Sequence, residues 1–190
     1  SSAASDVYKR QGEQSPTYSI VGAPAGAKPR ELDYPDDADA TGQKNNTYDG
    51  KGGVSLGNTL NRMLFAARFS EQNILLSNSI TSASRILYVR EPRARVEKVA
   101  PWLTVDSDAY PVVVDGRILW VLDGYTTSSN YPYAQHTALT DAIGDSVTSP
   151  AYDLRGKKIN YVRNAVKATV DAYDGTVHIY EWDSTDPILK

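Results

Sequence analysis

Two side chains near the C-terminal end of the chain could carry acid–base chemistry. The segment 166–182 has the pattern of two β-strands around Asp174-Gly175, a dipeptide typical of two-residue hairpin turns. A two-residue turn would place Asp171 directly opposite His178 on one face of this hairpin. A carboxylate beside an imidazole fixes its tautomer and stabilises the imidazolium, as in general-base and nucleophilic catalysis. We favour an ordinary cross-strand pair on a half-exposed sheet, because no G-x-S-x-G turn supplies a nucleophile.

An earlier segment, 112–122, has the same pattern of two strands around Asp115-Gly116. The turn sets Val114 opposite Arg117. The second strand is apolar on both faces, which predicts a central position in a sheet that is covered on both sides.

A polar, tyrosine-rich segment, 124–133, follows this second strand and is expected to be a loop. Loops on rigid scaffolds commonly carry recognition, and a tyrosine offers a partner both an apolar ring and a polar tip. Tyr125, Tyr131 and Tyr133 are therefore candidate binding residues, although such rings also cover sheet edges. Arg163 is a further binding candidate, with a structural ion pair as the default interpretation.

The sequence predicts neither a metal ion nor a cofactor. Asp37 and Asp39 match the opening of a calcium loop, but Tyr48 stands where the register requires a bidentate glutamate, so a solvated acidic loop is favoured. The chain contains no cysteine and only two histidines, His136 and His178. Thiolate zinc sites, iron–sulfur clusters and a three-histidine catalytic metal site are therefore excluded.

The composition is that of an ordinary globular chain. The 190 residues include 41% hydrophobic and 23% charged residues, with a net charge of −3. Disorder is not expected, and the near-neutral charge gives no basis for binding nucleic acid. No apolar run is long enough to cross a bilayer.

Basic residues are concentrated between positions 85 and 98, where a phosphate or an anionic lipid headgroup could bind. These residues are Arg85, Arg90, Arg93, Arg95 and Lys98. A solvated helix face explains the same pattern, and we favour it.

Three segments of the first half carry helical patterns. Leu56–Phe69 places an apolar stripe at three- and four-residue spacing, expected to pack on the core, with its start near Gly57 and Asn58. The segment 73–90 suggests two short helical pieces, and 93–100 suggests a helix with Pro92 at its first position. The apolar stripe consists of Leu56, Leu60, Met63, Leu64 and Ala67.

We therefore predict an α+β fold, with helices in the first half and an antiparallel sheet built from the two Asp-Gly hairpins in the second half. Residues 22–55 are expected to form a long loop. Residues 1–11 look like a non-native leader, because Ser5–Gln11 reads as a translated sequencing adaptor. Residues 12–190 are then a single α+β domain, truncated at both ends.

Several long ordered blocks of the sequence are more specific than one short motif. They include Tyr110–Arg117, Asp123–Ser128 and Ile159–Val177, together with Ala100-Pro101-Trp102-Leu103 and Tyr18–Gly22. Together these blocks resemble uncharacterised protein family 0182. The resemblance implies a large bacterial multi-pass integral membrane protein, of which this chain would be an internal piece of the extracytoplasmic region. No catalytic or binding residue is established for that family, so none can be assigned from it.

Together these observations favour a non-catalytic extracytoplasmic domain for interaction, sensing or structural support, located at the cell membrane. Its partners would be other envelope proteins or its own membrane-embedded part. One alternative is a cell-envelope hydrolase that uses His178 and Asp171, which would require His178 in a concave pocket. Another is a transport accessory domain whose basic segment 85–98 lies near lipid headgroups.

Overall fold

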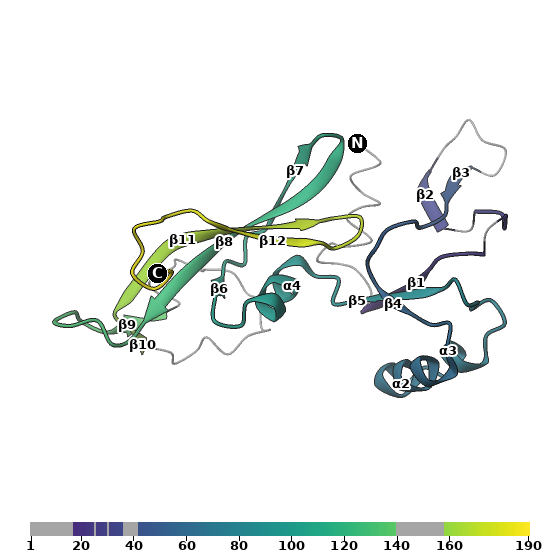
Figure 1. Ribbon diagram of the computed structural model, residues 1–190, viewed down its shortest axis with the longest axis horizontal. Coiled ribbons are helices and arrows are strands. Elements are labelled where there is room, and N and C mark those ends of the chain that lie inside the picture. The colour runs from purple at the N-terminus through teal and green to yellow at the C-terminus, as the bar shows by residue number, and fades with distance from the viewer. Residues whose placement is uncertain (1–16, 25, 30, 36–41, 140–157) are drawn as a thin grey trace. The chain divides into compact units, whose positions relative to one another are not determined.

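The computed structural model describes residues 17–24, 26–29, 31–35, 42–139 and 158–190. The chain forms two compact units, Ser1–Arg90 and Glu91–Lys190 (Figure 1). The predicted leader, residues 1–11, lies outside the described residues.

The first unit contains two small antiparallel sheets. One sheet has the strand order β1-β5-β4, with β1 at Tyr18–Val21, β5 at Arg85–Tyr88 and β4 at Val54–Ser55. The other pairs β2, Glu31–Pro35, with β3, Gln43–Asn46. The segment 22–55, expected to be one long loop, therefore contains three strands.

Two helices of the first unit lie between β4 and β5. The first, α2, spans Thr59–Phe69, and its N-cap residue Asn58 accepts a hydrogen bond from the Asn61 N–H at 2.7 Å. The second, α3, spans Asn73–Leu76. The start of α2 confirms the expected helix entry near Asn58.

The core of the first unit is aliphatic, with aromatic rings on its flank. Leu56, Ile74, Ile80 and Ile86 are buried together, and Phe65 and Phe69 of α2 pack against them. These two rings contact tyrosines of the sheet, since the Phe69 centroid lies 4.5 Å from that of Tyr18 and the Phe65 centroid 5.3 Å from that of Tyr88.

The second unit is built on a five-stranded antiparallel sheet. Its strands follow the order β12-β11-β8-β6, with β7 also paired to β8. Their bounds are β6 Thr104–Val105, β7 Tyr110–Val114, β8 Arg117–Ser128, β11 Tyr161–Asp171 and β12 Val177–Glu181. A separate short pair joins β9, Thr137–Ala138, to β10, Lys158–Ile159.

The first Asp-Gly hairpin forms as predicted. Val114 lies opposite Arg117, and both turn residues, Asp115 and Gly116, have positive φ angles of 50° and 75°. Strand β8 is central, because β11 pairs along one edge while β7 and β6 share the other.

One face of this sheet is packed. Trp120 and Leu122 of β8 and Val166 and Val170 of β11 are buried. Helix α4, Pro92–Val99, contacts β11 and β12. Its side chain Val96 is fully buried, whereas Val99 is exposed.

The predicted fold class is wrong, because the regular structure of the described residues is mostly strand, with few helices. The first half is not a helical region, since it contains the strands β1 to β5. Segment 85–88, expected to be helical, is instead the middle strand of a sheet. Its residues Ile86 and Leu87 are both buried, as in a strand covered on both faces.

Candidate functional site

The open face of the five-stranded sheet, opposite its packed face, brings together side chains from four strands. Cross-strand partners share a face of a sheet, so the register gives its membership. Lys167 lies opposite both Asp123 and Tyr180, and Thr169 lies opposite both Val121 and His178. The open face consists of Tyr110, Val112, Val114, Arg117, Leu119, Val121, Asp123, Tyr125, Asn164, Lys167, Thr169, Asp171, His178 and Tyr180.

The predicted pairing of Asp171 with His178 is wrong. Thr169, not Asp171, lies opposite His178. The second hairpin has a longer turn than expected, in which the Asp171 carbonyl accepts the Gly175 N–H at 2.8 Å and the Asp171 N–H donates to the Thr176 carbonyl at 2.9 Å. Four residues, 172–175, connect the strands in place of two. Asp171 and His178 remain on one face without forming a directly opposed pair.

The Asp171 carboxylate holds this turn together. Its Oδ1 accepts the backbone N–H groups of Tyr173 at 2.8 Å and Asp174 at 3.1 Å. Its Oδ2 accepts Nε of Arg117 from the neighbouring strand at 2.7 Å. Both oxygens are therefore occupied by structural donors.

These contacts also set the ionisation of Asp171. Burial opposes the charged form, but the hydrogen bonds from Arg117, Asp174 and Tyr173 outweigh it and lower the pKa of Asp171 below its ordinary value. The carboxylate is an ionised structural group at neutral pH.

A polar cluster occupies the centre of the open face. Asp123 accepts hydrogen bonds from Lys167 Nζ and from Asn164 Nδ2, the latter at 3.2 Å. The Lys167 ammonium also lies 5.6 Å from the ring centroid of Trp182, which is 69% exposed. The lysine is thus held between a carboxylate and an aromatic ring, and the ring remains available to a partner.

The three candidate tyrosines lie in different environments. Tyr125 belongs to strand β8 and not to a loop, and its hydroxyl donates to Asp106 at 2.7 Å. Tyr131 stacks on Tyr161 with ring centroids 5.5 Å apart, while Tyr133 is fully exposed. Only Tyr125 lies on the open face.

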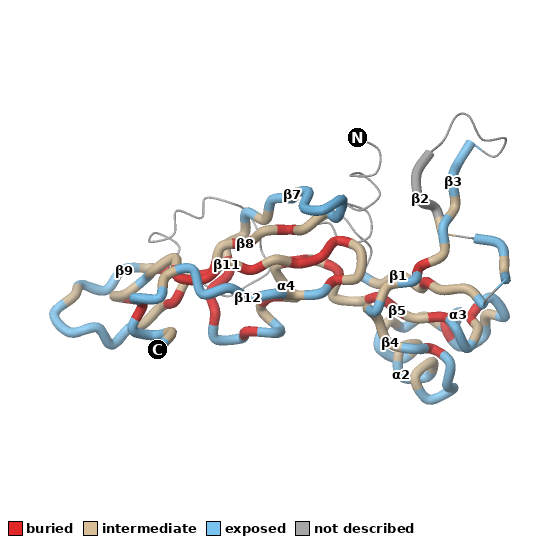
Figure 2. Tube along the Cα trace, turned by 45° about the horizontal axis from the view of Figure 1, so that its top comes forward, coloured by how far each residue is buried: buried red, intermediate tan, exposed pale blue. Residues whose placement is uncertain are grey.

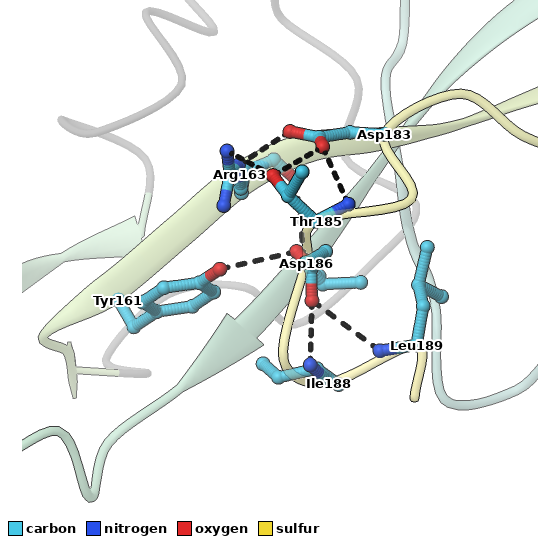
Figure 3. A network of polar contacts seen from close by, with 8 residues as sticks. Tyr161, Arg163, Asp183, Thr185, Asp186, Ile188 and Leu189 are labelled. Carbon is cyan, nitrogen blue, oxygen red and sulfur yellow. Dashed lines mark hydrogen bonds and ion pairs between the residues drawn. The ribbon is translucent and has the colours of Figure 1, made fainter.

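Arg163 belongs to a structural network on the opposite face (Figure 3). Its Nε lies 2.6 Å from Asp183 Oδ2, and one of its terminal nitrogens donates to Thr185 Oγ1 at 2.9 Å. Hydrogen bonds from the side chain and the backbone N–H of Thr185, together with Arg163, lower the pKa of Asp183. This is the ion pair expected by default for Arg163.

Asp186, which sequence reasoning missed, is the centre of the same network. It is fully buried and accepts the Tyr161 hydroxyl at 3.1 Å and the backbone N–H of Ile188 at 2.6 Å. Thr126 of β8 also donates to it. Burial opposes its ionisation, but these donors outweigh burial and lower the pKa of Asp186. The network ties the C-terminal segment to the sheet.

A second exposed surface lies on the first unit. The α2 stripe, consisting of Leu60, Met63, Leu64 and Ala67, is the apolar row expected to pack on the core. That expectation is wrong for these four residues, which are exposed, at 64%, 52% and 59% for the three larger ones. The core-facing side of α2 is the other row, with Phe65, Ala66 and Phe69. Helix α2 therefore has two apolar sides, of which one is covered.

A cavity of about 470 Å³ lies in the first unit, between β1, the start of β2 and the α3 region. Its lining includes Glu31, whose two oxygens accept the backbone N–H groups of Gly22 at 2.6 Å and Tyr48 at 2.8 Å. Buried Ser84 also lines it and donates to the Gly22 carbonyl at 3.3 Å. The side chains of Glu31 and Ser84 are therefore hydrogen-bonded to backbone groups around the cavity.

Most of the basic segment 85–98 is bound to the chain itself. Arg85 donates to the carbonyls of Lys51 and Gly53, each at 3.0 Å, and Arg90 is buried. Arg93 pairs with Glu97 and Arg95 donates to the Gly175 carbonyl at 2.8 Å. Lys98 is the exposed member. These contacts engage Arg85, Arg93 and Arg95 within the chain and so leave them less available to a headgroup.

Among the residues that the structure describes, no group of three or more His, Asp or Glu side chains could hold a metal ion. Asp37 and Asp39, the start of the rejected calcium loop, lie outside the described residues.

The fold and these surfaces define a β-rich chain of two units with exposed apolar and aromatic surfaces. A sequence model of the uncharacterised protein family UPF0182 matches residues 4–190. The chain belongs to this family, and the resemblance inferred from its sequence blocks is confirmed.

The curated relatives are bacterial proteins of the same family. UPF0182 proteins of Kineococcus radiotolerans and Streptomyces coelicolor are each 55% identical over 183 residues, and that of Paenarthrobacter aurescens is 54% identical over 181 residues. Each alignment covers 94% of this chain and 18% of the relative. The chain thus spans about a fifth of the length of these relatives.

No solved structure matches the chain. Within the described residues, the helices are too short or too polar to cross a membrane.

Proposed function

We propose that this chain is a non-catalytic interaction and support domain within a longer membrane protein, on the extracytoplasmic side. Its partners are the remainder of the same protein and neighbouring envelope proteins. The observation that carries the proposal is the α2 stripe, an apolar helix surface left exposed in a chain that spans 18% of its relatives.

The physical reason is the energy of apolar burial. A helix that carries apolar residues on two sides is usually buried on both of these sides. Burying a fully exposed leucine or methionine side chain contributes about 1.5–3 kcal/mol, and because Leu60, Met63 and Leu64 are 52–64% exposed, covering each provides roughly half of that and favours docking. The four-fifths of the relatives' length outside this chain supply the expected cover.

We do not favour the hydrolase, because Asp171 is occupied by Arg117 and by its own turn, and His178 lies on an open sheet face. We do not favour the transport accessory either, because Arg85, Arg93 and Arg95 bind within the chain.

Cysteine labelling tests the coverage of the α2 stripe. The chain contains no cysteine, so Met63→Cys places one thiol on the stripe, and Gln72→Cys places a control thiol at an exposed polar position nearby in sequence. We expect maleimide to label Met63→Cys at least about ten times more slowly in a cysteine-free full-length protein than in this chain. Gln72→Cys should react equally in both. Equal rates for Met63→Cys would contradict the proposal.

The same control thiol tests the location. In cells that produce the full-length protein, a membrane-impermeant maleimide should label Gln72→Cys before lysis. Labelling only after lysis would place this region on the cytoplasmic side and refute that part of the proposal.

A further inference from the structure

Strand β12 forms an edge of the five-stranded sheet. Among the described residues it pairs with β11 alone. Four of its five residues, from His178 to Glu181, are exposed, whereas β11 beside it has one exposed residue, Val162 (Figure 2). Within the part of the chain that the structure describes, the outer side of β12 is therefore open.

The register determines which backbone groups point outward. The Trp182 N–H donates to the Ala165 carbonyl at 2.8 Å, and the Asp171 N–H donates to the Thr176 carbonyl at 2.9 Å. In an antiparallel pair, hydrogen-bonded positions alternate with positions whose N–H and C=O face the other way. His178 and Tyr180 thus bond toward β11. The N–H and C=O groups of Val177, Ile179 and Glu181 face the open side.

The sequence of β12 favours strand addition at this edge. Val-His-Ile-Tyr-Glu has high β-propensity and contains no proline, glycine or lysine. Natural edge strands are commonly protected by proline, lysine, a bulge or a covering element. Ile179 is 37% exposed and Tyr180 49% exposed, so an added strand would cover apolar side chains as well as pair the backbone.

We propose that β12 receives an added antiparallel or parallel strand from the remainder of the full-length protein. This inference rests on the proposed interaction role, and it identifies β12 as a second surface, besides the α2 stripe, that contacts the rest of the full-length protein. The source is the same polypeptide because the relatives contain about four-fifths of their length outside this chain. The added strand would place an apolar residue beside Ile179, and its backbone would pair with the three outward-facing residues of β12.

Amide hydrogen exchange tests the pairing without any substitution. In this chain alone, the amides of His178 and Tyr180 should be protected by β11, while those of Val177, Ile179 and Glu181 should exchange freely. In the full-length protein we expect the exchange of these three outward amides to slow at least tenfold. Equal exchange of the outward amides in both proteins would overturn the proposal.

A pair of variants in the full-length protein separates backbone pairing from side-chain packing. Ile179→Pro removes one outward N–H and leaves the bonds to β11 in place, as proline is tolerated on the outer side of an edge strand. Ile179→Thr keeps the N–H. We expect fast exchange at Val177 and Glu181 to return in the proline variant only, with slow exchange retained at His178 and Tyr180, which pair with β11, confirming that the sheet is folded. The same exchange in both variants would contradict strand addition.

A second copy of the chain is the alternative occupant. Outward amides that become protected in this chain alone as its concentration rises would show self-pairing and overturn the proposal. The labelling of Met63→Cys reports the α2 stripe independently, so failure at β12 is distinguishable from failure of the proposed function.

Discussion

The role of Asp171 can be tested by removing its contacts in two steps. Asp171→Asn keeps an acceptor for the N–H groups of Tyr173 and Asp174 but loses the charge that binds Arg117. Asp171→Ala also removes the acceptor. Arg117→Ala removes the ion pair from the other side.

The structure predicts different losses in the free energy of unfolding for these three variants. The Arg117 side chain is 54% exposed, so solvent screens its ion pair and the pair contributes little to stability. Leaving the turn donors without an acceptor adds about 1–2 kcal/mol. We therefore expect a small loss in the free energy of unfolding for Arg117→Ala and Asp171→Asn, and a loss larger by about 1–2 kcal/mol for Asp171→Ala.

The pH dependence follows from the lowered pKa of Asp171. Because the native pKa is below the ordinary value of 3.8, the carboxylate stabilises the fold above that pH. This contribution is lost as the pH falls through the native pKa. The difference in unfolding free energy between the wild type and Asp171→Asn should therefore shrink below about pH 3.8.

Tryptophan fluorescence during urea unfolding measures these losses, because all three tryptophans, at positions 102, 120 and 182, belong to the second unit. Equal losses for Asp171→Asn and Asp171→Ala would refute the role of the carboxylate in holding the turn. A wild-type advantage that persists unchanged to pH 2 would refute its ionisation.

Three further variants probe other parts of the fold. Gly22→Ala should destabilise the first unit by about 2 kcal/mol or more, measured by circular dichroism, because φ is +89° and a Cβ would lie 2.6 Å from the Ala83 carbonyl oxygen. Glu91→Ala should cost the second unit about 1 kcal/mol in fluorescence-monitored unfolding, since Glu91 caps α4 by accepting from two backbone N–H groups. Asp186→Ala should cost about 2–3 kcal/mol and speed amide exchange at Ile188, which donates to it; unchanged exchange would contradict that role.

The two hairpins show how far turn chemistry can be predicted from sequence. At Asp115-Gly116 both residues take positive φ, and the predicted register is confirmed. At Asp174-Gly175 only the glycine does. The difference arises from Asp171, because its side chain accepts hydrogen bonds from the backbone N–H groups of Tyr173 and Asp174 and so stabilises a longer turn. The dipeptide alone does not reveal this competing acceptor.

Helix α2 shows a different limit of prediction from sequence. Its start at Asn58 could be predicted from local sequence, because capping involves neighbouring residues. Which apolar row packs inward could not be predicted, since 60, 63, 64 and 67 and the row 62, 65, 66 and 69 have the same spacing. The inward-facing row is determined by contacts between residues distant in sequence: Phe69 contacts Tyr18, and Phe65 contacts Tyr88.

These differences have a common physical origin, because local groups determine where elements begin while distant contacts determine which surfaces are buried. The same reasoning applies to the surfaces left open. The α2 stripe is apolar and β12 has the sequence of an inner strand, as is typical of buried structure. Both remain exposed in a chain that spans 18% of the length of its relatives. We propose that the rest of the longer protein covers both surfaces, which would account for the exposed apolar side chains of α2 and for the unpaired outward backbone of β12 among the described residues. If only one becomes protected in the full-length protein, the two surfaces serve different partners.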